Sequence, residues 1–302
     1  MSNISFDLSG KIDQQTVEAL AMVKRIADSL SIPFFVVGAS ARDFILKYCY
    51  GLESPRMTRD IDLGVEVASW EQFNQLKGTL IATGKLSPTT EQQRLSFDSV
   101  MIDIVPFGAI TYEKRQISWP PEHEIFMSMV GFKEAYEYSI TVRLSSDPEL
   151  DIKLPTLPGL AIMKIISWKE KYPERKKDAE DILLIMQKYE EAGNLDRLYD
   201  KEQDLLQEEN FDTRHAGIRL LGRDMAKIAD PETLNIVKTI LTSETEEQSR
   251  YRLVTDMIRG SLTFDHHFEE VLLEVEKLRK GIDEAGKKIN HFNHIVPNKF
   301  TN

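Results

Sequence analysis

The stretch from Thr58 to Val67 reads T-R-D-I-D-L-G-V-E-V, and its alternation decides the fold of the first part of the chain. Apolar residues at 61, 63, 65 and 67 alternate with acidic or small residues at 60, 62, 64 and 66. Because successive side chains of a strand point to opposite faces, this pattern predicts a β-strand with one face on a core. Asp60 and Asp62 then share the other face.

The two carboxylates on that face repel each other. At 4 Å and an effective dielectric near 20, the repulsion is roughly 4 kcal/mol. A positive group is therefore needed to keep both carboxylates ionised, and a divalent metal ion is the usual one. A solvated acidic strand edge explains the short D-x-D pattern of Asp60 and Asp62 equally well, so both interpretations stay open at this point.

A third carboxylate, Asp103, stands within the apolar run S-V-M-I-D-I-V-P from Ser99 to Pro106. Burying an unpaired charge is costly, so we expect Asp103 at the end of its strand or in the same cleft as Asp60 and Asp62. Three carboxylates in one cleft suit Mg²⁺, which takes oxygen ligands and completes its octahedron with water and substrate phosphates.

Upstream, the apolar run from Pro33 to Val37 ends at Gly38, and a helix-like stretch follows. Ser40 and Asp43 stand three residues apart, as in a variant capping box. A strand, a glycine and a helix N-terminus together form a geometry that binds phosphate through free N–H groups and the helix dipole. An ordinary capped strand-to-helix turn is the simpler alternative for this segment taken alone.

This order of a glycine turn, a D-x-D strand and a later carboxylate resembles the nucleotidyltransferase superfamily related to DNA polymerase β. Ala39 separates the glycine from the serine here, which departs from the Gly-Ser or Gly-Gly turn of that superfamily. The resemblance implies one or two Mg²⁺ ions on the three carboxylates. It also implies a nucleoside triphosphate at the turn, with nearby arginines as charge partners. The residues concerned are Gly38, Ala39, Ser40, Arg42, Arg59, Asp60, Asp62 and Asp103.

A second segment, L-P-G-L-A-I-M-K-I-I-S-W-K-E-K, runs from Leu157 to Lys171 and is followed by E-R-K-K-D-A-E-D-I-L-L-I. It resembles the AbiEii/AbiGii toxin type of nucleotidyltransferase, and the likeness covers about residues 30–190. The matching residues are Lys164, Lys177, Asp178 and Asp181. The resemblance implies that Lys164 is catalytic and that Asp178 and Asp181 serve nucleotide binding. It further implies transfer of a nucleoside monophosphate to an RNA or protein acceptor, and a separately encoded antitoxin partner.

Simpler roles remain open for the same residues. Lys164 interrupts a helix that is apolar nearly all round, so it either extends to the surface or reaches a buried anion. Asp178 falls in the first turn of its helix, where the dipole favours a carboxylate. A group of basic residues suits an RNA backbone, although a solvated loop is their commoner role: Lys169, Lys171, Arg175, Lys176 and Lys177.

The length of 302 residues suggests two domains. We expect an α+β fold, with a small mixed-sheet nucleotidyltransferase domain over 1–155 and an all-helical domain over 156–302. Helices are expected over 14–30 and from a capping box at Ser69 and Gln72 to residue 84. Strands are expected near 93–98, 100–106, 139–145 and 150–154, where the sequence is rich in alternating apolar residues.

The composition adds expectations about the environment of the protein. Cys49 is the single cysteine, so an internal disulfide is excluded and a reducing compartment is the default. The N-terminus lacks the basic and apolar parts of a signal peptide, and no apolar run reaches the length of a membrane span. We therefore expect a cytoplasmic protein. The net charge of −11 argues against broad non-specific nucleic-acid binding but leaves room for a local basic groove.

Taken together, these features predict a magnesium-dependent nucleotidyltransferase, the toxin of a toxin–antitoxin or phage-defence pair. Two other classes of protein remain. One is an enzyme of the same fold that modifies a small cationic molecule such as an aminoglycoside, for which an acidic cleft in the helical domain would speak. The other is a non-catalytic interaction protein that binds a nucleotide.

Overall fold

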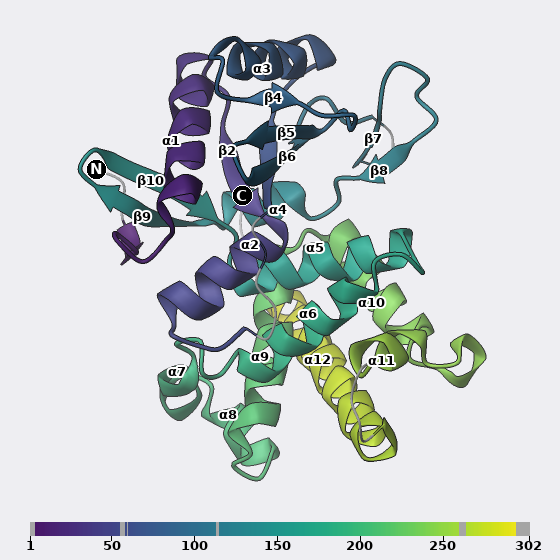
Figure 1. The fold of residues 1–302 in the computed structure, drawn as a ribbon. Coiled ribbons are helices and arrows are strands. Elements are labelled where there is room, and N and C mark those ends of the chain that lie inside the picture. Colours follow the sequence, from purple (N-terminus) through teal and green to yellow (C-terminus); the bar gives the residue numbers. More distant parts are fainter. Residues whose placement is uncertain (1–3, 55–57, 59, 113–114, 260–263, 294–302) are drawn as a thin grey trace, which may run out of the picture. The chain divides into compact units, whose positions relative to one another are not determined.

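The computed structural model describes residues 4–54, 58, 60–112, 115–259 and 264–293. The chain divides into two compact units, Met1–Glu170 and Lys171–Asn302, and each is considered by itself. Strands lie in the first unit, and helices alone make up the described part of the second (Figure 1). The expected α+β class is thereby confirmed. The helix over 157–170 falls in the first unit, whereas the sequence places it in the helical domain.

A five-stranded mixed sheet forms the centre of the first unit, with strand order β2-β3-β6-β5-β4. Strands β3 and β6 are parallel, and the other neighbouring pairs are antiparallel. The strands expected from the D-x-D run and from residues 93–106 are confirmed. The bounds are β2 (Phe34–Val37), β3 (Ile61–Glu66), β4 (Ser87–Pro88), β5 (Arg94–Phe97) and β6 (Val100–Phe107).

Two helices lie beside this sheet, α1 (Gln14–Ser29) and α3 (Trp70–Ala82), and they pack on each other (Figure 1). The Ser69 side chain accepts a hydrogen bond from the Gln72 backbone N–H at 3.4 Å, and the Gln72 side chain accepts one from the Ala68 N–H at 2.8 Å. The helix at 69–84 therefore begins as the sequence predicts, because these side chains satisfy N–H groups that a helix start leaves open.

The helix after β2 begins earlier than expected. Helix α2 (Gly38–Asp43) starts at the glycine itself and continues as a π-helix, η1 (Phe44–Cys49). Ser40 and Asp43 therefore lie inside the helix, and the predicted capping box is wrong. The Ser40 hydroxyl donates instead to the Val37 carbonyl at 3.1 Å, because a serine one turn into a helix reaches the carbonyl three residues before it.

An aromatic cluster fills the space between the central sheet and helix α4 (Phe132–Glu137). The ring of Phe35 lies 5.6 Å from that of Phe107 and 5.5 Å from that of Tyr136, both near edge-to-face. Edge-to-face contacts of this kind add about 0.5–1.5 kcal/mol each to the burial of the rings. Helix α4 in turn packs on α5 (Leu157–Glu170), whose residues are buried on nearly every side.

The strands expected near 139–145 and 150–154 are present but belong to a separate sheet of order β1-β9-β10. Strand β1 pairs parallel to β9, and β10 pairs antiparallel to β9. A short hairpin completes the strands. The bounds are β1 (Ile4–Asp7), β7 (Gln116–Ser118), β8 (Phe126–Ser128), β9 (Ile140–Ser146) and β10 (Glu149–Leu154).

The second unit is built around a close pair of helices, α9 and α12. Gly222 and Gly281 lie at their contact, and a Cβ at Gly222 would come within 2.8 Å of the Ile282 backbone nitrogen. The two backbones approach so closely because neither glycine has a side chain. The bounds are α6 (Lys176–Lys188), α7 (Leu195–Asp200), α8 (Gln203–Glu208), α9 (Thr213–Ile228), α10 (Pro231–Ser243), η3 (Glu247–Ser249), α11 (Arg252–Met257) and α12 (Phe264–Asn293).

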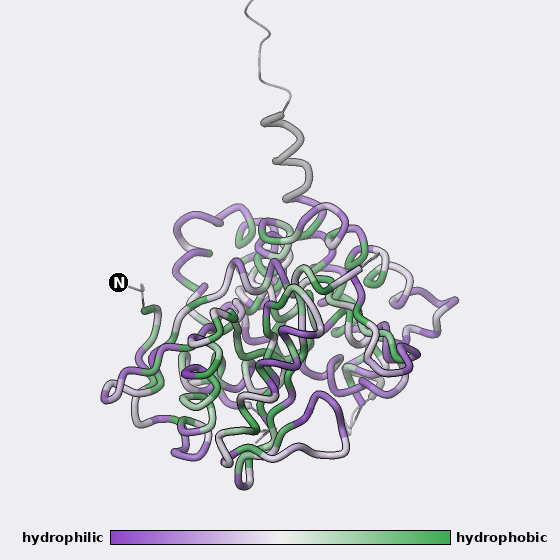
Figure 2. The backbone as a smooth tube through the Cα atoms, turned by 90° about the horizontal axis from the view of Figure 1, so that it is seen from above, coloured by the Kyte–Doolittle hydropathy of each residue, from purple (hydrophilic) through white to green (hydrophobic). Residues whose placement is uncertain are grey.

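Buried arginines tie these helices together. Arg219 is fully buried and pairs with Glu209 at 2.7 Å and Glu208 at 2.8 Å, and Arg223 pairs with Glu284 at 2.8 Å. In Figure 2, hydrophobic segments of the backbone trace gather toward the interior, and hydrophilic segments lie on the outer turns. Within the residues that the structure describes, no helix is both long enough and apolar enough to span a membrane.

Candidate active site

Asp62 and Asp103 are direct neighbours on two parallel strands. Strands β3 and β6 are in register so that Asp62 is the Cα partner of Asp103. Partnered residues on adjacent strands point to the same face, about 4.8 Å apart along the sheet. Both carboxylates are half-buried, while Ile61 and Ile102 beside them are buried on the other face. The expectation that Asp103 lies beside the D-x-D strand is confirmed.

The glycine turn lies against the same carboxylate. Val37, the last residue of β2, is the Cα partner of Asp62, and Gly38 follows with φ of +68°. A Cβ at Gly38 would stand 2.8 Å from Cγ of Asp62 and closer still to a carboxylate oxygen. Only glycine fits here, because it accepts the left-handed conformation and leaves the space that the Asp62 carboxylate fills. The turn of Gly38, Ala39 and Ser40 therefore begins its helix next to Asp62.

Arg94 supplies a positive charge at this site that the sequence analysis missed. It is the Cα partner of Asp103 across the β5–β6 hairpin, and it donates to both oxygens of that carboxylate, from Nε at 2.7 Å and from Nη2 at 2.8 Å. A two-point bond of this kind fixes a carboxylate in both distance and plane. Nη1 of Arg94 also donates to Glu91 at 3.2 Å.

The negative charge of Asp60 also stabilises the charged form of Arg94. The hydrogen bonds to Asp103 raise the pKa of Arg94 above its ordinary value, although its partial burial opposes this. The charges of Asp103, Glu91 and Asp60 contribute in the same upward direction. Asp60 is exposed and precedes β3 directly. Asp60 and Asp103 thus both act on Arg94, and Asp103 is the strand neighbour of Asp62.

The donor set fits a magnesium ion in part. Asp62 and Asp103 offer the hard oxygen atoms that Mg²⁺ takes, and the absence of a side chain at Gly38 lets the Asp62 carboxylate lie against the glycine turn. Among the described residues, no three His, Cys, Asp or Glu side chains come close enough together to hold a metal ion. Two carboxylates suffice for a magnesium ion that arrives with a triphosphate, since phosphate oxygens and water fill its remaining positions.

Of the two predicted arginines, Arg42 is 1% exposed and donates to the neighbouring Asp43 from Nε at 3.0 Å and from Nη2 at 2.6 Å. Asp43 also accepts from the Ser54 hydroxyl at 2.8 Å and from the Thr58 N–H at 3.1 Å. This pair ties helix α2 to the segment that leads into β3. Arg59 lies outside the described residues.

The remaining predicted residues are buried helix residues. Lys164 is 5% exposed in α5, and α5 packs on α2, the helix of the glycine turn. Its burial speaks against a side chain that extends to the surface, because a buried ammonium group needs an anionic partner. Asp178 and Asp181 are buried in α6 of the second unit, one helix turn apart. Their part in nucleotide binding stays a prediction.

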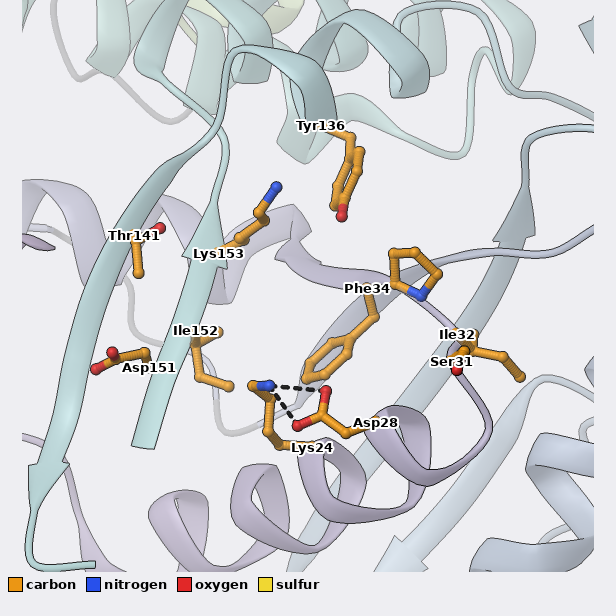
Figure 3. Close-up of a pocket in the computed structure, with 11 residues that line it drawn as sticks. Lys24, Asp28, Ser31, Ile32, Phe34, Tyr136, Thr141, Asp151, Ile152 and Lys153 are labelled. Carbon is orange, nitrogen blue, oxygen red and sulfur yellow. Dashed lines mark hydrogen bonds and ion pairs between the residues drawn. The ribbon is translucent and has the colours of Figure 1, made fainter. Parts of the chain in front are cut away.

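A cavity of about 570 Å³ in the first unit contains none of the predicted site residues. It lies between α1, the start of β2 and the edge of β10 (Figure 3). Its charges are largely paired internally, since Lys24 donates to Asp28 at 2.7 Å and the ammonium of Lys153 lies 4.1 Å from the Tyr136 ring centre. This cavity has no carboxylates grouped for a metal, so we place the candidate active site at Asp62 and Asp103.

In this fold, a sheet with two acidic residues side by side lies next to a glycine turn that opens a helix. The family model described as nucleotidyl transferase AbiEii toxin, type IV TA system, matches residues 22–273. The chain belongs to this family, and it is a nucleotidyltransferase.

Two solved structures of ANT(2″)-Ia are similar to this chain. The first is a solution structure of that antibiotic-resistance factor, with 15% identity and a TM-score of 0.33, covering 66% of this chain and 98% of that one. The second is a crystal structure in complex with adenylyl-2″-tobramycin, with 15% identity and a TM-score of 0.34, covering 67% and 99%. No curated protein matches the chain.

Proposed function

We propose that this nucleotidyltransferase is magnesium-dependent and moves a nucleoside monophosphate from a nucleoside triphosphate to a hydroxyl group of an RNA or a protein. The observation that carries the proposal is the register of Asp62 with Asp103, directly beside the turn at Gly38. Such a pair of carboxylates next to a helix start joins an oxygen site for a cation with N–H donors for a phosphate.

Each residue has a defined part in the proposed reaction. Asp60, Asp62 and Asp103 would hold one or two magnesium ions, which when bound supply positive charge at the reacting phosphates. Gly38, Ala39 and Ser40 donate backbone N–H groups to the leaving phosphates. Ser40 does so through its backbone, because its hydroxyl is bonded to Val37.

The acceptor oxygen attacks the α-phosphorus, the bond from that phosphorus to the oxygen bridging to the β-phosphate breaks, and pyrophosphate leaves. Asp103 accepts the proton of the attacking hydroxyl, and Arg94 keeps that carboxylate in one orientation. The ammonium group of Lys164 adds a point charge near the triphosphate. Most of the rate gain then comes from positioning and charge neutralisation.

Four further residues take supporting roles in the proposal. Arg42 acts through Asp43, to which it is bonded, and so holds the helix of the glycine turn in place. Arg59 is a charge partner of the triphosphate. Asp178 and Asp181 serve nucleotide binding from helix α6.

Family membership supports the toxin part of the proposal. The family is described as a toxin of type IV toxin–antitoxin systems, so the partner we propose is a separately encoded antitoxin protein. A cytoplasmic location agrees with a nucleoside triphosphate as substrate. The non-catalytic alternative is not carried forward, because the family is one of transferases.

The choice of acceptor follows from charge. A cationic small molecule would need an acidic cleft in the helical region. The second unit instead carries a cavity with three basic residues and one acidic residue in its wall, namely Lys176, Arg250, Arg252 and Asp256. Because Arg252 is paired with Glu244 and Lys176 with Asp256, the uncompensated charge of the described wall residues is that of Arg250, which suits a phosphate-bearing acceptor better than a cationic one. This observation supports an RNA acceptor over an aminoglycoside.

The direct test is a transfer assay with labelled nucleotides. Purified protein is incubated with Mg²⁺, total RNA or total protein, and each nucleoside triphosphate labelled at either the α- or the γ-phosphate. We expect covalent label from the α-phosphate alone, because the transferred group keeps only that phosphorus. Asp62→Asn should abolish the labelling, since it removes a carboxylate and nearly preserves the shape.

Asp98→Asn provides a matched control. Asp98 is exposed in the β5–β6 turn with φ of +49°, a conformation that asparagine also adopts. This variant should label as the wild type does. If no RNA or protein receives label, or if Asp62→Asn labels as well as Asp98→Asn, the proposed function is wrong.

A further inference from the structure

The second unit contains a cavity of about 540 Å³ whose charge bears on the choice of acceptor, but to which the proposed reaction assigns no ligand. The turn before α6, the start of α6, η3 with the residue that follows it, and α11 form its wall. The wall residues are Tyr172, Lys176, Gln248, Ser249, Arg250, Arg252, Thr255 and Asp256. Three of them are basic and one is acidic, although the whole chain has a net charge of −11. A local group of basic residues in a chain of negative net charge points to an anionic ligand at that place.

Arg252 is a fixed part of this wall. Its guanidinium donates to Glu244 from Nε and from Nη2, both at 2.7 Å, and lies 4.8 Å from the centre of the Tyr172 ring. Glu244 is 1% exposed, so the partner that holds Arg252 is itself buried and fixed in the protein. The arginine is thus held between a carboxylate and an aromatic face, which fixes the cation without the entropy cost of ordering it on binding.

Two other cations in the wall keep free capacity for hydrogen bonds. The ammonium of Lys176 forms an ion pair with Asp256 at 3.8 Å, a separation longer than a hydrogen bond. Arg250 is exposed, and its side chain has no hydrogen bond or ion pair with any residue that the structure describes. A lysine and an arginine with open donors on one cavity offer up to eight N–H groups to a ligand.

The backbone that carries Arg250 is held in an uncommon conformation. Arg250 and Tyr251 follow each other with φ of +55° and +51°, which costs about 1–2 kcal/mol for each non-glycine residue. The Tyr251 ring packs edge-to-face on Phe268 at 5.3 Å and so holds this turn in place. Strained residues of this kind gather at ligand clamps, where the structure around them fixes the conformation.

The chemistry of the wall selects among anions. A carboxylate has two oxygens and is satisfied by one arginine, whereas a phosphate presents three or four oxygens. Here Lys176 and Arg250 stand with the side chains of Gln248 and Thr255, which add an amide and a hydroxyl donor. Arginine's planar fork matches phosphate, and lysine adds a point charge. We infer that this cavity is a phosphate-binding site for a phosphate group of a nucleotide or of an RNA strand.

The inference does not rest on the transfer reaction, so it is tested in a background that cannot transfer. All variants carry Asp62→Asn and are studied with EDTA present, which removes metal-dependent binding at the active site. The probe is a short single-stranded RNA labelled with fluorescein, followed by anisotropy. Inorganic phosphate and ATP are then measured by calorimetry.

The decisive variant is the pair Lys176→Gln and Arg250→Gln. Each loses one charge-assisted contact, so the double variant should bind about 100-fold more weakly, or about tenfold for each contact. For RNA, the slope of log affinity against log salt should also fall by about 0.7 for each phosphate contact removed. Lys201→Gln is the matched control, since Lys201 is an exposed lysine of the same unit and is not part of the cavity wall.

The ligands distinguish the sources of the phosphate. Loss of RNA binding in the double variant identifies a polynucleotide, and loss of phosphate and ATP binding without an effect on RNA identifies a small phosphorylated ligand. Either result supports the site. Absence of binding to all three probes, or equal binding by the double variant and the Lys201→Gln control, overturns it. Circular dichroism of each variant checks that the fold is kept.

Discussion

The carboxylate of Asp62 occupies the space that a side chain at Gly38 would fill, since a Cβ there would lie 2.8 Å from Cγ of Asp62. Position 38 also has φ of +68°. The positions of the glycine turn and the acidic strand are therefore coupled, because neither can shift without moving the other.

Gly38→Ala should therefore disturb the site twice, through its backbone and through Asp62. We expect activity to fall about 100-fold, the loss that follows from a displacement of about 1 Å in a reacting group. We also expect a loss of about 1–2 kcal/mol in the free energy of unfolding. Activity is measured by label transfer and stability by urea denaturation.

Gly84→Ala separates these two effects. Gly84 has φ of +74°, and a Cβ there meets no atom within 4 Å. This control should lose about 1 kcal/mol of stability while its activity is unchanged. If both variants keep full activity, the contact between Gly38 and Asp62 has no part in the reaction.

Arg94→Gln should lower kcat by about 10- to 100-fold, a typical effect of removing the group that orients a ligating carboxylate. The KM for the nucleoside triphosphate should stay nearly constant, because Arg94 bonds Asp103 and is not assigned to the triphosphate. The kcat of Arg94→Lys should lie between those of the wild type and Arg94→Gln, since lysine keeps the charge but not the two-point geometry.

The control for this series is Arg25→Gln, which removes the charge of an exposed arginine on α1. It should leave kcat and KM unchanged. A kcat for Arg94→Gln equal to that of Arg25→Gln would show that the Arg94 pair is structural only.

The third prediction concerns the stability of the second unit and its dependence on pH. Asp224 accepts hydrogen bonds from Tyr189 at 2.6 Å, from Arg197 at 2.8 Å and from Lys227 at 2.9 Å. Burial alone would raise the pKa of Asp224, but these bonds outweigh it and hold the pKa below the ordinary value of 3.8. The ionised form is thus stabilised by folding.

A carboxyl group with a lowered pKa stabilises the fold above its unfolded-state pKa and loses this contribution as the pH falls through the folded-state value. Asp224→Asn should therefore cost about 3 kcal/mol at pH 7, and the difference from wild type should shrink below about pH 3.8. Chemical denaturation at a series of pH values measures this. Asp200→Asn, at an exposed position of α7, should change little at any pH. A pH-independent cost for Asp224→Asn would contradict the assignment.

Much of the first unit follows from local patterns in the sequence. The alternation in β3 fixes which residues face the core, and the capping pair Ser69 and Gln72 marks the start of α3. These features depend on residues close together in the chain, so elementary geometry suffices. The position of Asp103 beside Asp62 also follows, because a lone acid in an apolar strand has few places where its charge can lie.

Arg94 was missed although the sequence contains a signal for it. Asp98 and Ser99 form a two-residue turn, and counting outward pairs Phe97 with Val100 and finally Arg94 with Asp103. The pairing of Arg42 with Asp43 and the early start of α2 could not be found in this way. Ser54 and Thr58 also bond Asp43 from 11 and 15 residues further along the chain, and no local pattern encodes contacts of that kind.

The most direct test of the central claim is the anomalous diffraction of crystals soaked with Mn²⁺ and a non-hydrolysable nucleoside triphosphate. Manganese replaces magnesium at oxygen sites and gives a peak that is independent of any assumption about the reaction. We predict a peak within coordination distance of the Asp62 and Asp103 carboxylates, with the triphosphate at the Gly38 turn. A bound triphosphate with no manganese peak at these two carboxylates, or with the peak elsewhere, would contradict this prediction.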